Sequence, residues 1–183
     1  IIQTLRRGSF DVSLDEYLKV VAMKTGELFE VACGLGAAQS DADAEVRRSL
    51  ETFGRTFGVA YQIYDDCLDI FSSEEKAGKS LGTDIATGKV TLPVLIARDR
   101  ASDTDRNRLG TLFTHFEEGN LREIVGILAK YRTLEESVAF VHRHLSEAVE
   151  ALKPLQESPS KDSLNNLCAI LSTQLETLLA DRC

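Results

Sequence analysis

The chain of 183 residues is 43% hydrophobic and carries a formal net charge of −8. This length and apolar content suffice for one domain, and no linker rich in proline, glycine or serine divides residues 1–183. The negative charge argues against nucleic acid as a partner, because a phosphate backbone would be repelled. The four cysteines have no CxxC spacing and form no zinc set with the three histidines, which favours reduced thiols in a cytoplasmic protein.

The first predicted helix begins after Ser13 and carries Lys24 and Thr25. Glu16 follows Ser13 by three residues, a spacing that is typical of a capping box. In such a box each side chain accepts a hydrogen bond from the backbone N–H of the other residue. A stretch of small residues follows at 32–37.

A second, long helix is predicted to run to residue 71, with Asp41 or Asp43 as its N-terminal cap. Gly54 and Gly58 lie four residues apart within it, so they share one face of the helix. Each glycine costs about 1 kcal/mol relative to alanine in a helix, which indicates that a neighbouring helix approaches closely there. Structural packing and a substrate pocket both account for such an approach.

The end of the long helix reads QIYDDCLD, in which Asp65, Asp66 and Asp69 follow Gln62 by three, four and seven residues. On an α-helix these four polar side chains share one stripe. Three like charges within two turns repel one another, so the stripe calls for full solvation or for a cation. Mg²⁺ binds one or two carboxylates and completes its octahedron with water and phosphate oxygens. Taken alone, the motif fits both a solvated helix face and a magnesium diphosphate site.

The segment after this stripe is basic and rich in glycine. It reads GKSLGTD at 78–84 and GKVTLP at 88–93. Glycine lets backbone N–H groups approach an anion closely, and the ammonium groups of Lys79 and Lys89 add charge-assisted hydrogen bonds to phosphate oxygens. The acidic stripe and the basic loop therefore complement each other through a metal-bound diphosphate.

Helical patterns continue to the end of the chain, with no alternation typical of strands. Pro93 stands early in a short apolar helix, where its missing N–H costs little. Further helices are predicted at 105–116, 121–131, 133–152 and 161–179, and Pro154 and Pro159 lie at the break before the last one. Leucines recur every three or four residues in that last helix, which favours a core stripe over an interaction face. The predicted fold class is all-α.

These ordered motifs resemble those of the trans-isoprenyl diphosphate synthases, the polyprenyl synthetase family. The run at 62–69 is similar to the family's second aspartate-rich motif, the two GK runs follow it in the family's order, and the KT pair at 24–25 precedes it. The resemblance implies an isoprenoid synthase-type helical bundle. The family's first aspartate-rich motif has no counterpart in the sequence, so we expect an incomplete bundle that corresponds to the C-terminal part of a synthase.

The resemblance also implies the metal and the reaction. Asp65 is expected to bind Mg²⁺ directly, while Asp66 and Asp69 hold metal-bound water or the second carboxylate position. The expected enzyme is a prenyltransferase that ionises an allylic diphosphate and joins it to isopentenyl diphosphate, giving a longer trans-prenyl diphosphate. A homodimer is the implied assembly.

Five side chains are expected to bind the allylic diphosphate. Lys24 and Lys79 are also expected to be catalytic, because their charges stabilise the departing diphosphate. The implied substrate-binding residues are Lys24, Thr25, Gln62, Lys79 and Lys89.

Two other functions stay open at this point. Without the first aspartate-rich motif, the chain also fits a catalytically incomplete partner or regulatory subunit of another prenyl diphosphate synthase. The intact aspartates and lysines argue against that role, since a purely structural partner does not need them. A class I terpene cyclase also ionises a metal-bound diphosphate, but the Asn/Asp-Ser/Thr-Glu motif that it needs does not follow Asp69.

Overall fold

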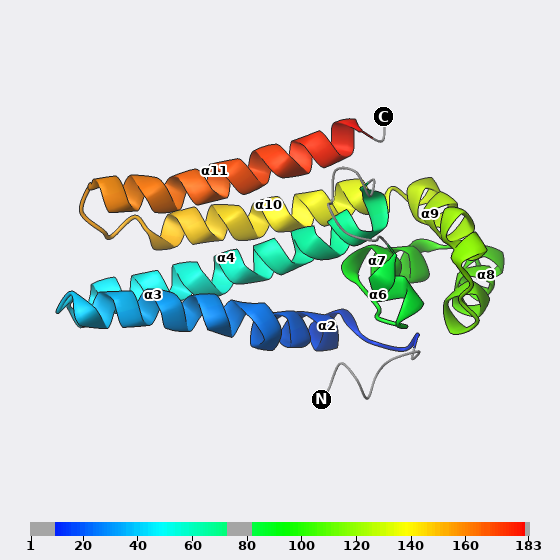
Figure 1. The fold of residues 1–183 in the computed structure, drawn as a ribbon, viewed down its shortest axis with the longest axis horizontal. Helices are drawn as coiled ribbons and strands as arrows, with labels where there is room; N and C mark the ends of the chain where they lie inside the picture. The colour runs from blue at the N-terminus through cyan, green and yellow to red at the C-terminus, as the bar shows by residue number, and fades with distance from the viewer. Residues whose placement is uncertain (1–9, 73–81, 182–183) are drawn as a thin grey trace.

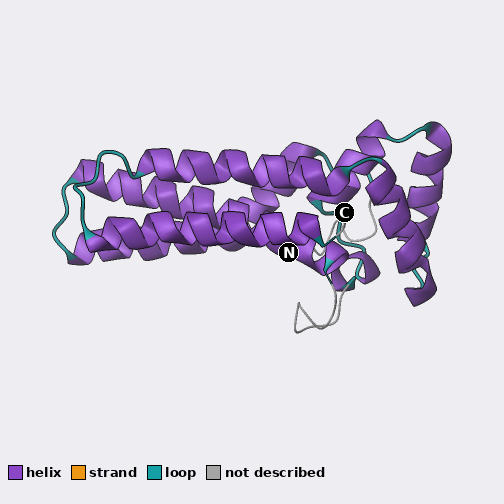
Figure 2. Cartoon of the chain, turned by 90° about the horizontal axis from the view of Figure 1, so that it is seen from above, coloured by secondary structure: helices purple, strands orange, loops and turns teal. Residues whose placement is uncertain are grey.

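The computed structural model describes residues 10–72 and 82–181, except for the side chain of Glu118. All regular secondary structure in these ranges is helical, as predicted (Figures 1 and 2). The long helices α3, α4, α10 and α11 lie lengthwise in a bundle, and the shorter helices α6 to α9 gather at one end of it (Figure 1). No helix among the described residues combines the length and the apolar character needed to cross a membrane.

The first helical segment consists of α2 (Leu14–Val21), a π-helical turn η1 (Ala22–Gly26) and α3 (Glu27–Gln39). The predicted capping box at Ser13 is confirmed. Its hydroxyl accepts a hydrogen bond from the Glu16 N–H at 3.2 Å, and the Glu16 carboxylate accepts one from the Ser13 N–H at 3.0 Å. The π-helical turn was not predicted, and it contains Lys24 and Thr25. Such turns occur frequently at functional sites.

Helix α4 (Ala44–Phe71) is the predicted long helix. Of the two predicted caps, Asp43 is the one used, because its carboxylate accepts hydrogen bonds from the backbone N–H groups of residues 45 and 46 at 2.9 Å. A Cβ atom at Gly54 would lie 2.4 Å from the carbonyl oxygen of Phe29, and one at Gly58 would lie 2.9 Å from the Cα of Gly26. The predicted close approach is therefore confirmed, and its partners are α3 and η1.

The remaining elements are α6 (Thr83–Ala86), α7 (Leu92–Arg100), α8 (Asp103–Thr114), η2 (Glu118–Asn120), α9 (Leu121–Lys130), α10 (Thr133–Ala151) and α11 (Pro159–Ala180). The helices predicted from Pro93 onward are confirmed with ends that differ by a few residues. Pro93 stands in the first turn of α7, as expected. Pro159 was predicted to lie in the break before the last helix, but it stands in the first turn of α11. The short helix α6 was not predicted.

The core surrounds α4, which packs against α3 on one side and against α10 on the other (Figures 1 and 2). Burial of one large apolar side chain contributes roughly 1.5–3 kcal/mol, so the many buried side chains of α4 and α10 hold these helices in register. The predicted core stripe of α11 is confirmed at four positions. These buried residues are Cys168, Leu171, Leu175 and Leu178.

Candidate functional site

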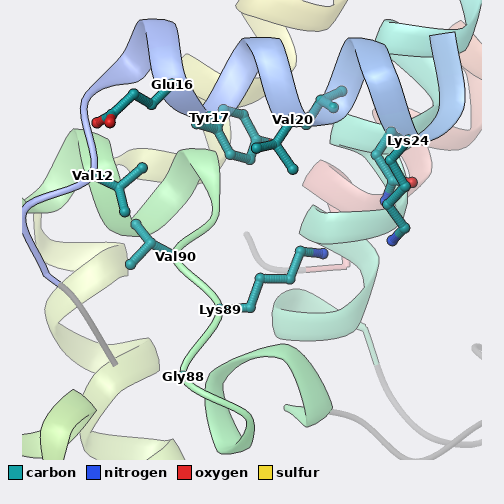
Figure 3. Close-up of a pocket in the computed structure, with 10 residues that line it drawn as sticks. Val12, Glu16, Tyr17, Val20, Lys24, Gly88, Lys89 and Val90 are labelled. Atoms are coloured by element: carbon teal, nitrogen blue, oxygen red, sulfur yellow. The ribbon is translucent and has the colours of Figure 1, made fainter. Parts of the chain in front are cut away.

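A pocket lies where α2, η1 and the end of α4 meet the segment that precedes α7. One side of this pocket is apolar, and Val12, Val20 and Val90 contribute to it. On the other side, Lys24 and Lys89 extend their ammonium groups toward the same region (Figure 3). The pocket thus joins a wall suited to hydrocarbon with an end suited to an anion.

The charge of Asp66 is balanced by a lysine. The carboxylate of Asp66 is fully buried, and its Oδ1 lies 2.7 Å from the Nζ of Lys89. The same ammonium lies 2.5 Å from Oδ2 of Asp84. The sequence pattern called for solvation or a cation at this stripe, and at Asp66 the structure provides an ammonium ion. Burial lowers the pKa of Lys89, but the two carboxylates outweigh this effect and raise that pKa above its ordinary value.

Two further donors complete the surroundings of Asp66. The Tyr17 hydroxyl donates to Oδ2 at 2.8 Å, and the Gln62 amide donates to Oδ1 at 2.9 Å. Burial raises the pKa of Asp66, while the positive charge of Lys89 opposes this shift. Burial, together with the neighbouring carboxylate, raises the pKa of Tyr17 well above its ordinary value. The tyrosine therefore stays protonated at neutral pH and remains a donor.

The π-helical turn is connected to the acidic helix through Gln62. The hydroxyl of Thr25 donates to the side-chain oxygen of Gln62 at 2.6 Å. The side-chain nitrogen of Gln62 then faces Asp66, and it lies 3.5 Å from a carboxylate oxygen of Asp65. The structure thus brings together four residues that the sequence placed at one site, and Lys24 lines the same pocket.

The third carboxylate, that of Asp69, fastens the basic segment to the end of α4. Its two oxygens accept hydrogen bonds from the Thr83 hydroxyl at 2.9 Å and from the Asp84 N–H at 3.0 Å. The backbone oxygen of Asp69 accepts a third bond from the N–H of Gly82 at 2.8 Å. Gly82 has a φ of 70°, a conformation that glycine adopts at little cost. Asp69 therefore fixes the turn that leads to Lys89.

The carboxylates fit a metal that is shared with a phosphate ligand. Within residues 10–72 and 82–181, no group of three His, Cys, Asp or Glu side chains is arranged to hold a metal ion by itself. Mg²⁺ needs only one or two protein carboxylates when phosphate oxygens and water supply the rest. Asp65 is partly exposed, whereas Asp66 and Asp69 are buried. Asp65 is thus the carboxylate of the three that a ligand can reach most readily.

Sequence reasoning missed two residues of this site, and a third residue that it predicted cannot be compared with the structure. Tyr17 and Asp84 contact the network, although no role was predicted for either. Tyr17 lies seven residues before Lys24, a spacing that puts both on one side of a helix, but a tyrosine at such a position also fits a core residue. Lys79, which was predicted to bind substrate and to be catalytic, lies outside the described residues.

Comparison with known proteins identifies the class to which this fold and site belong. Residues 1–128 match the family model described as polyprenyl synthetase. The chain therefore belongs to the polyprenyl synthetase family, as its motifs predicted.

Two relatives and one solved structure show how far the similarity extends. The chain is 38% identical over 154 residues to the short chain isoprenyl diphosphate synthase of Methanothermobacter thermautotrophicus, which covers 84% of this chain and 47% of that protein. It is 35% identical over 164 residues to heptaprenyl diphosphate synthase component 2 of Bacillus subtilis, and this alignment covers 90% of this chain and 47% of that protein. The chain spans about half the length of these relatives.

The solved structure is a polyprenyl synthase from Caulobacter crescentus in complex with calcium and isoprenyl diphosphate. It superposes with a TM-score of 0.88 at 25% identity, over 93% of this chain and 53% of that one. The all-α fold of the family is therefore confirmed, and this chain contains about half of it.

Proposed function

We propose that this chain carries the second metal–diphosphate wall of a prenyltransferase. The reaction is the condensation of isopentenyl diphosphate with an allylic diphosphate to give a longer trans-prenyl diphosphate. The observation that carries the proposal is the arrangement of Lys89. Its ammonium is held by Asp66 and Asp84 at a pocket that also contains Lys24 and an apolar wall. The names of the relatives, which are prenyl diphosphate synthases, support the same substrate class.

The chemistry follows from where negative charge develops. When the allylic C–O bond breaks, its electron pair goes to the diphosphate oxygen, and the cations at the pocket stabilise that charge. Lys89 is a fixed cation of this kind and Lys24 lines the same pocket, and we assign Lys79 to the same task. Bound Mg²⁺ would neutralise further charge on the diphosphate. Attack by the double bond of isopentenyl diphosphate and loss of a proton complete the condensation.

We assign roles to the remaining polar residues of the site from the contacts that they make. Asp65 is the direct carboxylate ligand for Mg²⁺, and Asp66 and Asp69 act behind it, where they fix the lysine and the turn around the metal position. Thr25 and Gln62 orient one another beside the diphosphate. Protein dipoles and charges that are held in this way need little reorganisation during the reaction.

Product analysis tests the proposal. The protein is incubated with Mg²⁺, radiolabelled isopentenyl diphosphate and an allylic diphosphate, and the products are separated by chain length. We expect a longer prenyl diphosphate, at a rate that falls by about 10²-fold or more in Asp65→Asn. The matched control is Asp162→Asn, which changes an exposed aspartate on α11 and leaves the rate within about twofold. A cyclic hydrocarbon product, or near-normal turnover by Asp65→Asn, would refute the assignment.

A second function is favoured by the name of one relative, heptaprenyl diphosphate synthase component 2 of Bacillus subtilis. The chain would then be a catalytically incomplete partner or regulatory subunit of another prenyl diphosphate synthase. Binding of Mg²⁺ and diphosphate without turnover, and turnover only after a second subunit is added, would establish this alternative.

The assembly and location belong to the same proposal. We propose one domain over residues 1–183, a homodimer, which the family resemblance implies, and a cytoplasmic location. The described cysteines support a reducing compartment, because Cys33, Cys67 and Cys168 are free thiols. Sedimentation of the purified protein at two concentrations measures the assembly directly.

A further inference from the structure

Tyr17 is a buried residue of the pocket whose contact with the acidic helix has no part in the function proposed above. Its side chain lies on α2, 4% exposed, and its ring forms part of the pocket wall (Figure 3). The hydroxyl crosses to α4 and donates to Oδ2 of Asp66 at 2.8 Å. This hydrogen bond connects residues that are 49 positions apart in the sequence.

The carboxylate of Asp66 connects Tyr17 with Lys89. Oδ2 accepts from Tyr17, whereas Oδ1 accepts from Gln62 and Lys89. Because both oxygens belong to one rigid planar group, a donor that fixes Oδ2 also fixes Oδ1. The position of Oδ1 in turn determines where the ammonium of Lys89 lies. Thus the tyrosine hydroxyl affects the position of a cation that it does not contact.

The ammonium of Lys89 can still serve a ligand. An ammonium group has three donor hydrogens, and Asp66 and Asp84 accept from two of them. The side chain of Lys89 is 11% exposed and lines the pocket, so the third hydrogen can reach an anion there. A small rotation of Asp66 would turn this donor away from the anion.

We propose that Tyr17 is a positioning residue of the diphosphate site, which acts through Asp66 to hold the ammonium of Lys89 at the pocket. This inference rests on the proposed function, because the anion is the diphosphate of that reaction. Removal of the hydroxyl leaves a buried carboxylate oxygen without its donor. Such an oxygen is costly, so Asp66 turns toward other donors and Lys89 moves with it.

Binding of inorganic diphosphate in the presence of Mg²⁺, measured by isothermal titration calorimetry, tests the proposal. Tyr17→Phe keeps the ring in the wall and removes only the hydroxyl, and it should weaken binding about tenfold. The matched control is Tyr61→Phe, which removes the hydroxyl of a tyrosine on α4 that is 43% exposed and should change binding less than about twofold.

A double-mutant cycle shows whether the effect passes through the lysine. In the Lys89→Met background, Tyr17→Phe should weaken binding by less than about twofold further, because the group it positions is gone. In the Lys24→Met background the full effect of about tenfold should persist. An equal effect in the Lys89→Met and wild-type backgrounds would overturn the proposal, as would normal binding by Tyr17→Phe. If the wild type binds no diphosphate, the proposed function itself fails.

A second measurement needs no ligand and does not depend on the stability of Lys89→Met. The ¹H–¹⁵N signal of the Lys89 ammonium is assigned in the NMR spectrum with Lys89→Arg and compared between variants. We expect Tyr17→Phe to shift or broaden this signal and Tyr61→Phe to leave it in place. Replacement of Tyr17 by para-aminophenylalanine, which retains a donor, should restore both the signal and the binding. An unchanged Lys89 signal in Tyr17→Phe would overturn the proposal.

Discussion

The ammonium of Lys89 lies 2.7 Å from the carboxylate of Asp66, which is 23 residues earlier in the chain and fully buried at the end of α4. This pair connects the aspartate-rich helix with the basic segment before α7. It thereby turns two sequence motifs into one site. Since each charge needs the other as its counter-charge, the pair also makes the site important for the stability of the fold.

Removal of this lysine should destabilise the protein strongly. Lys89→Met leaves the Asp66 carboxylate buried without its counter-charge, and a broken buried pair costs about 3–5 kcal/mol. Urea denaturation measures the loss. The matched control is Lys153→Met, in which a pair with Glu150 is lost whose side chains are 68% and 62% exposed, and its cost should stay below about 1 kcal/mol. Equal losses in both variants would contradict the importance of the buried pair.

The contact between α3 and α4 predicts opposite effects for two glycine substitutions. In Gly54→Ala the added Cβ would lie 2.4 Å from the carbonyl oxygen of Phe29, so the helices must separate, at a cost of about 1–3 kcal/mol. In Gly36→Ala on α3 the added Cβ meets no atom of a neighbouring element within 4 Å, and the variant should gain up to about 1 kcal/mol from helix propensity. Thermal unfolding of the two variants measures both, and a neutral Gly54→Ala would show that the helices do not touch there.

Loss of the Asp69 side chain should loosen the turn before Lys89. Asp69→Ala removes the acceptors of the Thr83 hydroxyl and of the Asp84 N–H, each worth about 1 kcal/mol. Hydrogen–deuterium exchange should therefore become faster at the Asp84 amide than in the wild type. The Gly82 amide is an internal control with less change, since it donates to the backbone oxygen of Asp69, which the substitution retains. Unchanged exchange at Asp84 would refute the fastening role.

The raised pKa values predict a loss of stability in alkali. The pKa of Lys89 lies above its ordinary value of 10.5 and that of Tyr17 lies well above 10.0, so the native state keeps protons that the unfolded chain releases. Stability from these groups is present below pH 10 and is lost as the pH rises through the native values. Urea denaturation between pH 9 and 11.5 should show this decline, with a smaller slope in Tyr17→Phe. An equal slope in that variant would contradict the raised pKa of Tyr17.

The sequence allowed much of this structure to be predicted, because helix signals are local. The capping residues Ser13 and Asp43 begin α2 and α4, and the close pair Gly54 and Gly58 lies at a helix contact. The π-helical turn at Lys24 escaped prediction, since it changes the hydrogen-bonding register without any residue type that marks it.

The sequence predicted which residues belong to the site, but it did not predict which of them contact each other. The motif placed Asp66 and Lys89 at one site, yet it could not show that they pair with each other, because their contact depends on how the segment after α4 folds back. Tyr17 was missed for a similar reason. Its hydroxyl reaches Asp66 only through the packing of α2 on α4, which no local pattern records.

The central claim is that this chain holds a diphosphate through Lys24 and Lys89 and through a metal at Asp65. Titration of inorganic diphosphate into the protein by calorimetry, with Mg²⁺ and then with EDTA, tests it most directly. We predict binding that requires Mg²⁺, that is lost in Asp65→Asn and that persists in Asp162→Asn. Binding that is equally strong in EDTA, or that survives in Asp65→Asn, would contradict the metal site, and the absence of any binding would contradict the proposed function.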